Sequence, residues 1–208
     1  MKNLTIINHP LIKRDLTILR DQETGTHLFR TTLRRIAAVL AFEVTRDLKI
    51  RKSTVRTPLE KTTGYHLAEE LIIVPVLRAG LGFVDGFLDF LPDARVGHVG
   101  LYRNEETLQP VDYYSKFPRT LSKSIVLLLD PMLATGGSGA AAITFLKKKG
   151  ARRIRFVSLL AAPEGVRKIA SVHPDVRMFT TVLDRQLDKH GYILPGLGDA
   201  GDRIFGTD

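Results

Sequence analysis

Residues 125–143 read IVLLLDPMLATGGSGAAAI, and this stretch decides the fold. The first five residues form an unbroken apolar run, which is typical of a strand buried on both faces of a parallel sheet. Asp130-Pro131 follows, and because proline cannot donate to a ladder, we expect the strand to end there. The small residues Ala134-Gly139 come next. The alanines after them open a helix that we expect to run to Lys149 and to end at Gly150.

This order of strand, acid, glycine-rich turn and helix favours a site for a phosphate beside a sugar. The free N–H groups at the start of a helix, together with the positive end of its dipole, attract an anion. The carboxylate of Asp130 can accept hydrogen bonds from ribose hydroxyls. No lysine follows the glycines, so the P-loop pattern fails. A tight strand–helix turn that binds no ligand is the alternative.

The segment resembles the motif for 5-phospho-α-D-ribose 1-diphosphate (PRPP) of the type I phosphoribosyltransferases. The resemblance rests on the apolar strand, the acid and the turn Thr135-Gly136-Gly137-Ser138. Many members carry two adjacent acids at the strand end, but proline stands at the second position here, so any role for a second carboxylate there is absent. The resemblance implies that PRPP binds to Asp130, Pro131, Met132, Leu133, Ala134, Thr135, Gly136, Gly137 and Ser138.

The composition is that of an ordinary globular protein. The chain has 208 residues, of which 44% are hydrophobic and 25% charged, which fits one domain or a domain with a small appendage. The absence of cysteine excludes disulfides, thiol chemistry and cysteine metal sites. The first residues lack a signal-peptide apolar core, and no run approaches the roughly 20 apolar residues of a membrane helix. We therefore expect a cytoplasmic protein without a membrane partner.

The formal net charge of +9 suits either polyanionic small ligands or nucleic acid. The densest basic cluster is Lys147-Lys149 with Arg152, Arg153 and Arg155. It lies at the C-terminal end of the expected helix, where cations complement the dipole. This position favours a solvated helix end over a surface for RNA, so we expect no nucleic-acid partner.

Strands and helices alternate along the rest of the chain. Residues 1–25 are expected to be irregular, with His9-Pro10 breaking any helix, and 49–61 to be a basic, solvated connection. We expect helices at 26–48, 83–91 and from 163 to before 173, and strands at 70–77, 95–101, 154–160 and 176–183. This alternation predicts an α/β fold, a parallel sheet flanked by helices with right-handed connections. Ligands of such sheets lie outside the carboxyl ends of the strands.

Two arginines follow predicted strands. Arg78 stands at a strand exit beside two glycines, and in the type I phosphoribosyltransferases the equivalent loop wraps the pyrophosphate; an arginine that caps a surface turn is the alternative. Arg103 precedes a polar stretch, 104–123, whose length favours a functional or mobile loop. The resemblance implies a flexible loop or hairpin arm here that closes over the reacting sugar, with Arg103 bringing positive charge to the pyrophosphate.

The last residues, 191–208, read GYILPGLGDAGDRIFGTD. They formally match a dinucleotide fingerprint, but we expect no helix in the residues that remain and find no acid at the required spacing. We expect a rigid irregular loop whose glycines expose main-chain groups able to match the edge of uracil. The segment resembles the base-binding hood of uracil phosphoribosyltransferases, with Ile193, Gly198, Asp199 and Ala200 at the matching positions.

The resemblance runs over nearly the whole chain and implies one domain, 1–208, with a core at about 66–183 and a uracil-binding segment at 184–208. It implies transfer of the phosphoribosyl group of PRPP to uracil, giving UMP and diphosphate, with Asp130, Asp199 and Arg103 as catalytic residues. Asp199 could assist the metal, the sugar or deprotonation of the base. The resemblance also implies Mg²⁺ held mainly by PRPP, a homodimer or higher oligomer, and a possible GTP effector. A non-catalytic RNA-binding relative and a transferase for another base are the rival interpretations.

Overall fold

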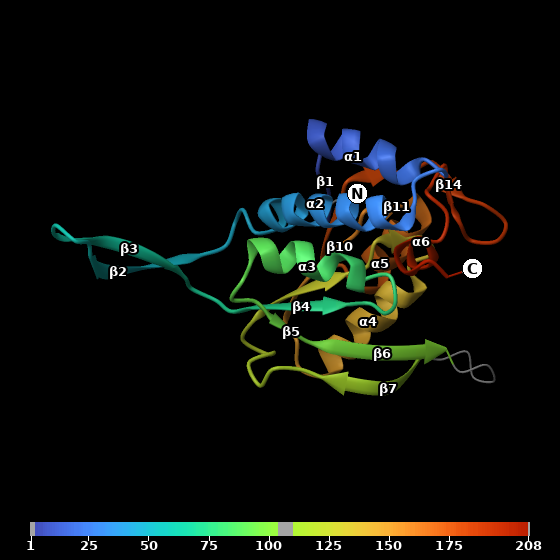
Figure 1. Cartoon of the computed structure of the whole chain (residues 1–208). Coiled ribbons are helices and arrows are strands. Elements are labelled where there is room, and N and C mark those ends of the chain that lie inside the picture. Colours follow the sequence, from blue (N-terminus) through green and yellow to red (C-terminus); the bar gives the residue numbers. More distant parts are fainter. Residues whose placement is uncertain (1–2, 104–109, 208) are drawn as a thin grey trace.

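Six parallel strands form the central sheet of the computed structural model, which describes residues 3–103 and 110–207, with only the backbone at 101–103 and 110–113 (Figure 1). Their order across the sheet is β1-β12-β10-β8-β4-β5. The bounds are β1 Leu4–Ile6, β4 Leu71–Pro75, β5 Arg95–Val96, β8 Ile125–Leu129, β10 Arg153–Val157 and β12 Arg177–Thr180. The predicted α/β fold with a parallel sheet is therefore confirmed.

Helices cover both faces of this sheet, as Figure 1 shows. One face packs against α1 (Pro10–Arg20), α2 (Thr26–Val44) and α3 (Leu81–Phe90), and the other against α4 (Gly137–Lys148) and α5 (Pro163–Val172). Successive residues of a strand point to opposite faces. In β8, Leu127 and Leu129 join the first apolar cluster, while Val126 and Leu128 join the second. This two-sided burial explains the unbroken apolar run.

The N-terminal residues are ordered into β1 and α1, so the prediction that 1–25 are irregular is wrong. Pro10 stands in the first turn of α1, where its missing N–H costs no hydrogen bond. The side chain of His9 accepts a hydrogen bond from the N–H of Leu11 and caps the helix. The pair His9-Pro10 thus starts a helix, and Ile12 and Leu19 bury its apolar face.

Residues 50–67 form an antiparallel hairpin. The stretch at 49–61 is largely exposed, as predicted, but the prediction of a connection without strands is wrong. Strands β2 (Ile50–Arg56) and β3 (Lys61–Leu67) pair along their full length and project away from the body of the molecule (Figure 1). The hydroxyl of Thr57 accepts hydrogen bonds from the N–H groups of Leu59 and Glu60 and fixes the turn. We call this hairpin the arm; it is separate from the loop or hairpin expected at 104–123.

The predicted strand at 95–101 is split at Gly97. A Cβ on this residue would lie 2.7 Å from Cδ1 of Phe117, so a larger residue there would require the Phe117 ring to shift. After the split, β6 (His98–Arg103) pairs antiparallel with β7 (Pro110–Lys116). The predicted loop at 104–123 therefore contains a strand, and its first six residues, 104–109, lie outside the described part.

The remaining predicted elements are found with shifted ends. The helix expected at 26–48 ends at Val44. The strands expected at 154–160 and 176–183 each break in two, giving β11 (Leu160–Ala161) and β13 (Val182–Leu183). These short strands form a second parallel sheet with β9 (Met132–Leu133), in the order β13-β11-β9. Among the described residues, the helices are too short or too polar to cross a bilayer.

The tail, residues 184–207, contains strands β14 (Gln186–Leu187) and β15 (Ile193–Leu194) and a short helix, α6 (Ala200–Phe205). The expectation that no helix follows the glycines is wrong. Asp199 caps α6 by accepting a hydrogen bond from the N–H of Asp202, and Gly206, at a φ of 67°, ends it. Four tail side chains enter the core beside α2 and α3: Ile193, Leu197, Ala200 and Ile204.

Candidate active site

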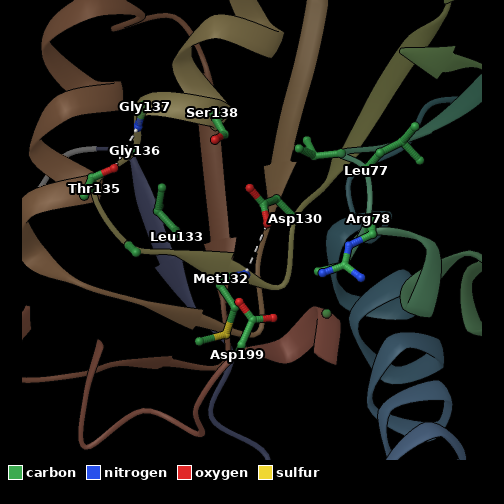
Figure 2. Close-up of a pocket in the computed structure, with 15 residues that line it drawn as sticks. Leu77, Arg78, Asp130, Met132, Leu133, Thr135, Gly136, Gly137, Ser138 and Asp199 are labelled. Carbon is green, nitrogen blue, oxygen red and sulfur yellow. Dashed lines mark hydrogen bonds between the residues drawn. The ribbon is translucent and has the colours of Figure 1, made fainter. Parts of the chain in front are cut away.

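A pocket of about 250 Å³ opens beyond the carboxyl ends of β4 and β8. Its walls come from the loop after β4 (76–79), from Asp130, from the turn at 132–139, and from Asp199 and Gly201 of the tail (Figure 2). Segments far apart in the sequence thus meet at the position where parallel sheets bind ligands. Of the residues expected to bind PRPP at 130–138, all but Pro131 line this pocket.

Pro131 instead holds the turn in place. Its carbonyl accepts hydrogen bonds from the N–H groups of Leu159 and Leu160, at 3.0 and 2.9 Å. These bonds connect the exit of β8 with the start of β11. The proline therefore contributes to the shape of the pocket without lining it.

The glycine-rich turn presents the start of α4 to the pocket. Gly136 has a φ of 77°, a conformation that favours glycine. A Cβ there would also lie 2.8 Å from the carbonyl oxygen of Gly165, because α5 packs closely against the turn. Gly136 supplies no capping side chain, and the N–H of Gly137 donates to Oγ1 of Thr135 at 3.3 Å. The next N–H groups, those of Ser138 and Gly139, have no acceptor within the helix and can meet an anion. This arrangement is suited to a phosphate.

Asp130 points into the pocket from the end of β8 (Figure 2). Burial of its carboxyl raises the pKa to about 7, and the hydrogen bond from the N–H of Met132, at 3.3 Å, lowers it in part. The unliganded group therefore carries a proton for part of the time near neutral pH. A cation or a set of hydroxyl donors in the pocket would favour the ionised form.

Arg78 lies at the rim of the same pocket, facing the space around Asp130 and Asp199 in Figure 2. Its Nη2 donates to Oδ1 of Asp202 at 3.0 Å, and its Nη1 donates to Oγ1 of Thr207 at 3.3 Å. The guanidinium is thus attached to the tail in the unliganded molecule. Arg103 lies at the end of β6, and its side chain is outside the described part of the chain. Its predicted role stays a prediction.

Of the residues expected to bind uracil, Asp199 lines the pocket directly. The side chains of Ile193 and Ala200 are buried among apolar residues, with exposed fractions of 4% and 3%. Neither residue lines the pocket, and their predicted part in binding uracil stays a prediction. Gly198, just before Asp199, does not line the pocket and has a φ of 81°, a backbone conformation that favours glycine.

Arg20 has a role in the site's architecture that the sequence did not indicate. Its guanidinium binds both carboxylate oxygens of Asp184, at 2.6 and 3.1 Å, and donates to the carbonyl of Gly196 at 2.8 Å. Asp184 in turn accepts a hydrogen bond from the N–H of Gly196 at 3.1 Å. This brace fixes the tail just before Gly198. The partners are more than 160 residues apart, so no local pattern reveals them.

Three of the six cations in the basic cluster form ion pairs with acids. Lys147 forms an ion pair with Asp175 at 2.6 Å, and Arg155 forms one with Asp47 at 2.6 Å. Arg153 pairs with Glu69. Lys147 lies at the end of α4, whereas Arg153 and Arg155 lie in β10, and the expectation of a solvated helix end stays a prediction.

The fold and the pocket first define a class. The structure of adenine phosphoribosyltransferase from Leishmania donovani has the same fold, with a TM-score of 0.60 over 92% of this chain and 88% of that one at 16% identity. This likeness shows the type I phosphoribosyltransferase fold, the fold that the glycine-rich turn and the acid at the strand exit had indicated.

The family follows from closer relatives. The model of the family described as uracil phosphoribosyltransferase matches residues 6–207. The uracil phosphoribosyltransferase of Salinibacter ruber is 56% identical over 207 residues, covering 100% of this chain and 99% of the relative. A solved structure from Aquifex aeolicus is 40% identical, with a TM-score of 0.90 and 97% of each chain covered. The chain belongs to the uracil phosphoribosyltransferase family, which confirms the resemblance noted in the sequence.

Proposed function

We propose that this pocket transfers the phosphoribosyl group of PRPP to uracil, giving UMP and diphosphate in pyrimidine salvage. One observation carries the proposal: the start of α4, the Asp130 carboxyl and the tail line the same pocket in a chain of this family. The start of α4 binds the 5′-phosphate, and Asp130 accepts hydrogen bonds from the ribose hydroxyls. Arg78 binds the diphosphate, joined by Arg103.

Catalysis then rests on positioning and charge. The ribose develops oxocarbenium-like positive charge as diphosphate leaves, and no covalent nucleophile is required. An ionised Asp130 stabilises that charge. Position 131 is proline, so the second carboxylate of the pocket comes from Asp199 in the tail. Asp199 is placed to assist the sugar, the metal or the base.

A magnesium ion fits this donor set when it arrives with PRPP. Within the described residues, no group of three or more His, Cys, Asp or Glu side chains is arranged to hold a metal. Mg²⁺ in phosphoryl substrates is commonly held by one or two carboxylates together with substrate oxygens, and Asp130 and Asp199 are the carboxylates available here. When bound, the ion neutralises charge on the departing diphosphate.

We further propose that the chain is a homodimer or higher homo-oligomer, and the arm supports this. An isolated two-stranded hairpin is marginally stable in water. The arm nevertheless exposes large apolar side chains, at fractions of 59% for Ile50, 95% for Leu59 and 59% for Tyr65. A second copy of the chain would cover them. A cytoplasmic location and regulation by GTP stay predictions, the latter testable by titrating GTP into the assay.

The choice of base tests the proposal. At N3 uracil donates a proton where cytosine has a lone pair, and at C4 uracil accepts where cytosine has an amino group. Two mismatched groups at about 1–3 kcal/mol each predict a preference for uracil of roughly 30-fold to 10⁴-fold in kcat/KM. Comparable use of both pyrimidines, or better use of a purine, contradicts the assignment. Tight RNA binding without transfer would favour the RNA-binding alternative.

A further inference from the structure

Arg78 connects two parts of the pocket that are far apart in the sequence. It belongs to the loop after β4, whereas its partners Asp202 and Thr207 belong to α6 and the residues that follow it. A Cβ on Gly201 would lie 3.7 Å from Nη2 of Arg78, so the guanidinium lies close above the start of α6. The ion pair therefore joins the proposed diphosphate loop to the proposed base-binding tail.

The main chain of Asp202 has its own partners within α6. Its N–H donates to the Asp199 side chain, and its carbonyl accepts from the N–H groups of Gly206 and Thr207. These bonds do not require the carboxylate. The carboxylate instead binds the Thr207 hydroxyl at 2.7 Å and Arg78 at 3.0 Å, and these two contacts lower the pKa of Asp202 below its ordinary value. Its charge is therefore present at neutral pH and is directed at Arg78.

Stability alone does not account for this pair. The side chains of Arg78 and Asp202 are 59% and 31% exposed, and exposed ion pairs contribute little to folding. A guanidinium has five N–H donors in a fixed planar arrangement. The tail occupies two of them in the unliganded molecule. Among the residues that the structure describes, the other N–H groups have no acceptor and can meet an anion in the pocket that Arg78 lines.

We infer that Asp202 is a positioning residue, which holds the guanidinium of Arg78 so that its remaining N–H groups meet the diphosphate of PRPP. The inference rests on the proposed function, since Arg78 is the group through which Asp202 acts. A long arginine side chain loses rotamer freedom when it is fixed on a ligand. Fixing it beforehand reduces that loss at the moment of binding. The base-binding tail thereby contributes to capture of the other substrate.

The test is a cycle of substitutions read out by PRPP binding. Asp202→Asn keeps the shape of the side chain and removes its charge. We expect the Kd and KM for PRPP to rise about two- to fivefold, the range of one exposed ion pair, with a smaller change in kcat. In an Arg78→Ala background the same substitution should have no further effect, because the group through which it acts is gone.

A matched control is the exposed pair between Arg34 on α2 and Asp89 on α3, at 2.6 Å. Both side chains are about half exposed, at 54% and 46%, and neither lines the pocket. Asp89→Asn should leave the Kd for PRPP unchanged. Thr207→Ala should weaken PRPP binding less than Asp202→Asn, and Thr207→Ser, which keeps the hydroxyl, should restore it.

Unchanged or tighter PRPP binding in Asp202→Asn overturns the inference. An equal loss in the wild-type and Arg78→Ala backgrounds overturns it as well, because Asp202 would then act by another route. PRPP binding can be measured without transfer to uracil. A wild-type chain that binds PRPP but does not use uracil therefore contradicts the proposed function, while the substitution cycle still tests the role of Asp202. A wild-type chain that does not bind PRPP contradicts both.

Discussion

Replacing Asp130 by Asn should make the unliganded protein more stable above neutral pH while it removes most of the activity. Burial raises the pKa of this carboxyl to about 7 in the folded chain, against an ordinary value of 3.8. Below pH 3.8 the group is protonated in both states, so it has no effect on the free energy of unfolding. As the pH rises, the unfolded chain ionises first, and the wild type loses stability until about pH 7.

The size of the effect follows from these pKa values. The pKa values of Asp130 in the folded and unfolded chains differ by about three units, and each unit corresponds to 1.36 kcal/mol. The stability that the wild type loses to this carboxyl above pH 7 is therefore at most about 4 kcal/mol. Water in the open pocket screens part of this cost, so we expect a gain of about 2–4 kcal/mol for Asp130→Asn at pH 8. Asparagine can still accept the hydrogen bond from the N–H of Met132, so the turn at β8 should be retained.

The assay is urea unfolding of both proteins without ligand from pH 4 to pH 8.5, with kcat/KM for PRPP measured in parallel. The effect of the pKa difference should be only about 0.6 kcal/mol at pH 4 and should grow up to about pH 7. Turnover should fall at least about tenfold, because charge-assisted bonds to the ribose are lost. Asp89→Asn is the control: Arg34 lowers the pKa of Asp89, so this variant should gain no stability at pH 8. Parallel pH profiles for wild type and Asp130→Asn would refute the reasoning.

Two further predictions concern the metal and the tail. Chelation with EDTA should abolish transfer and added Mg²⁺ should restore it, since the described residues provide few ligands of their own; full turnover in excess EDTA would contradict this. Asp184→Asn should weaken the brace formed by Arg20, Asp184 and Gly196. The loss of about 1 kcal/mol or more per hydrogen bond should raise the KM for uracil several-fold, while the Kd for PRPP stays constant. Equal loss for both substrates would show a general structural role.

The central motif could be predicted from the sequence because its signals are local. A strand buried on both faces must be apolar throughout, and a turn that approaches an anion must be built from small residues, so 125–143 indicated the sheet and the pocket together. The sequence also predicted that Asp130 and Arg78 lie at one site. Both follow strands whose carboxyl ends lie at one edge of a parallel sheet.

The errors have physical causes as well. A proline can either end a helix or stand in its first turn, so Pro10 alone does not predict α1. The burial of Ile12 and Leu19 against the core favours the helix, and this burial is a tertiary contact. The arm lacks the apolar alternation of a half-buried strand because neither of its faces meets the body of this chain. The brace from Arg20 to Asp184 depends on tertiary contact between residues 164 positions apart. None of these features has a signal within a short window of sequence.

The late position of the tail has a consequence for synthesis of the chain. All strands of the central sheet precede residue 181, and the buried residues of the cluster facing α4 and α5 lie between 72 and 178. The cluster facing α2 and α3 still lacks Ile193, Leu197, Ala200 and Ile204 at that stage. Because the same tail carries Asp199, one segment completes both this apolar cluster and the lining of the pocket. We therefore expect a nascent chain arrested before the tail to lack transfer activity.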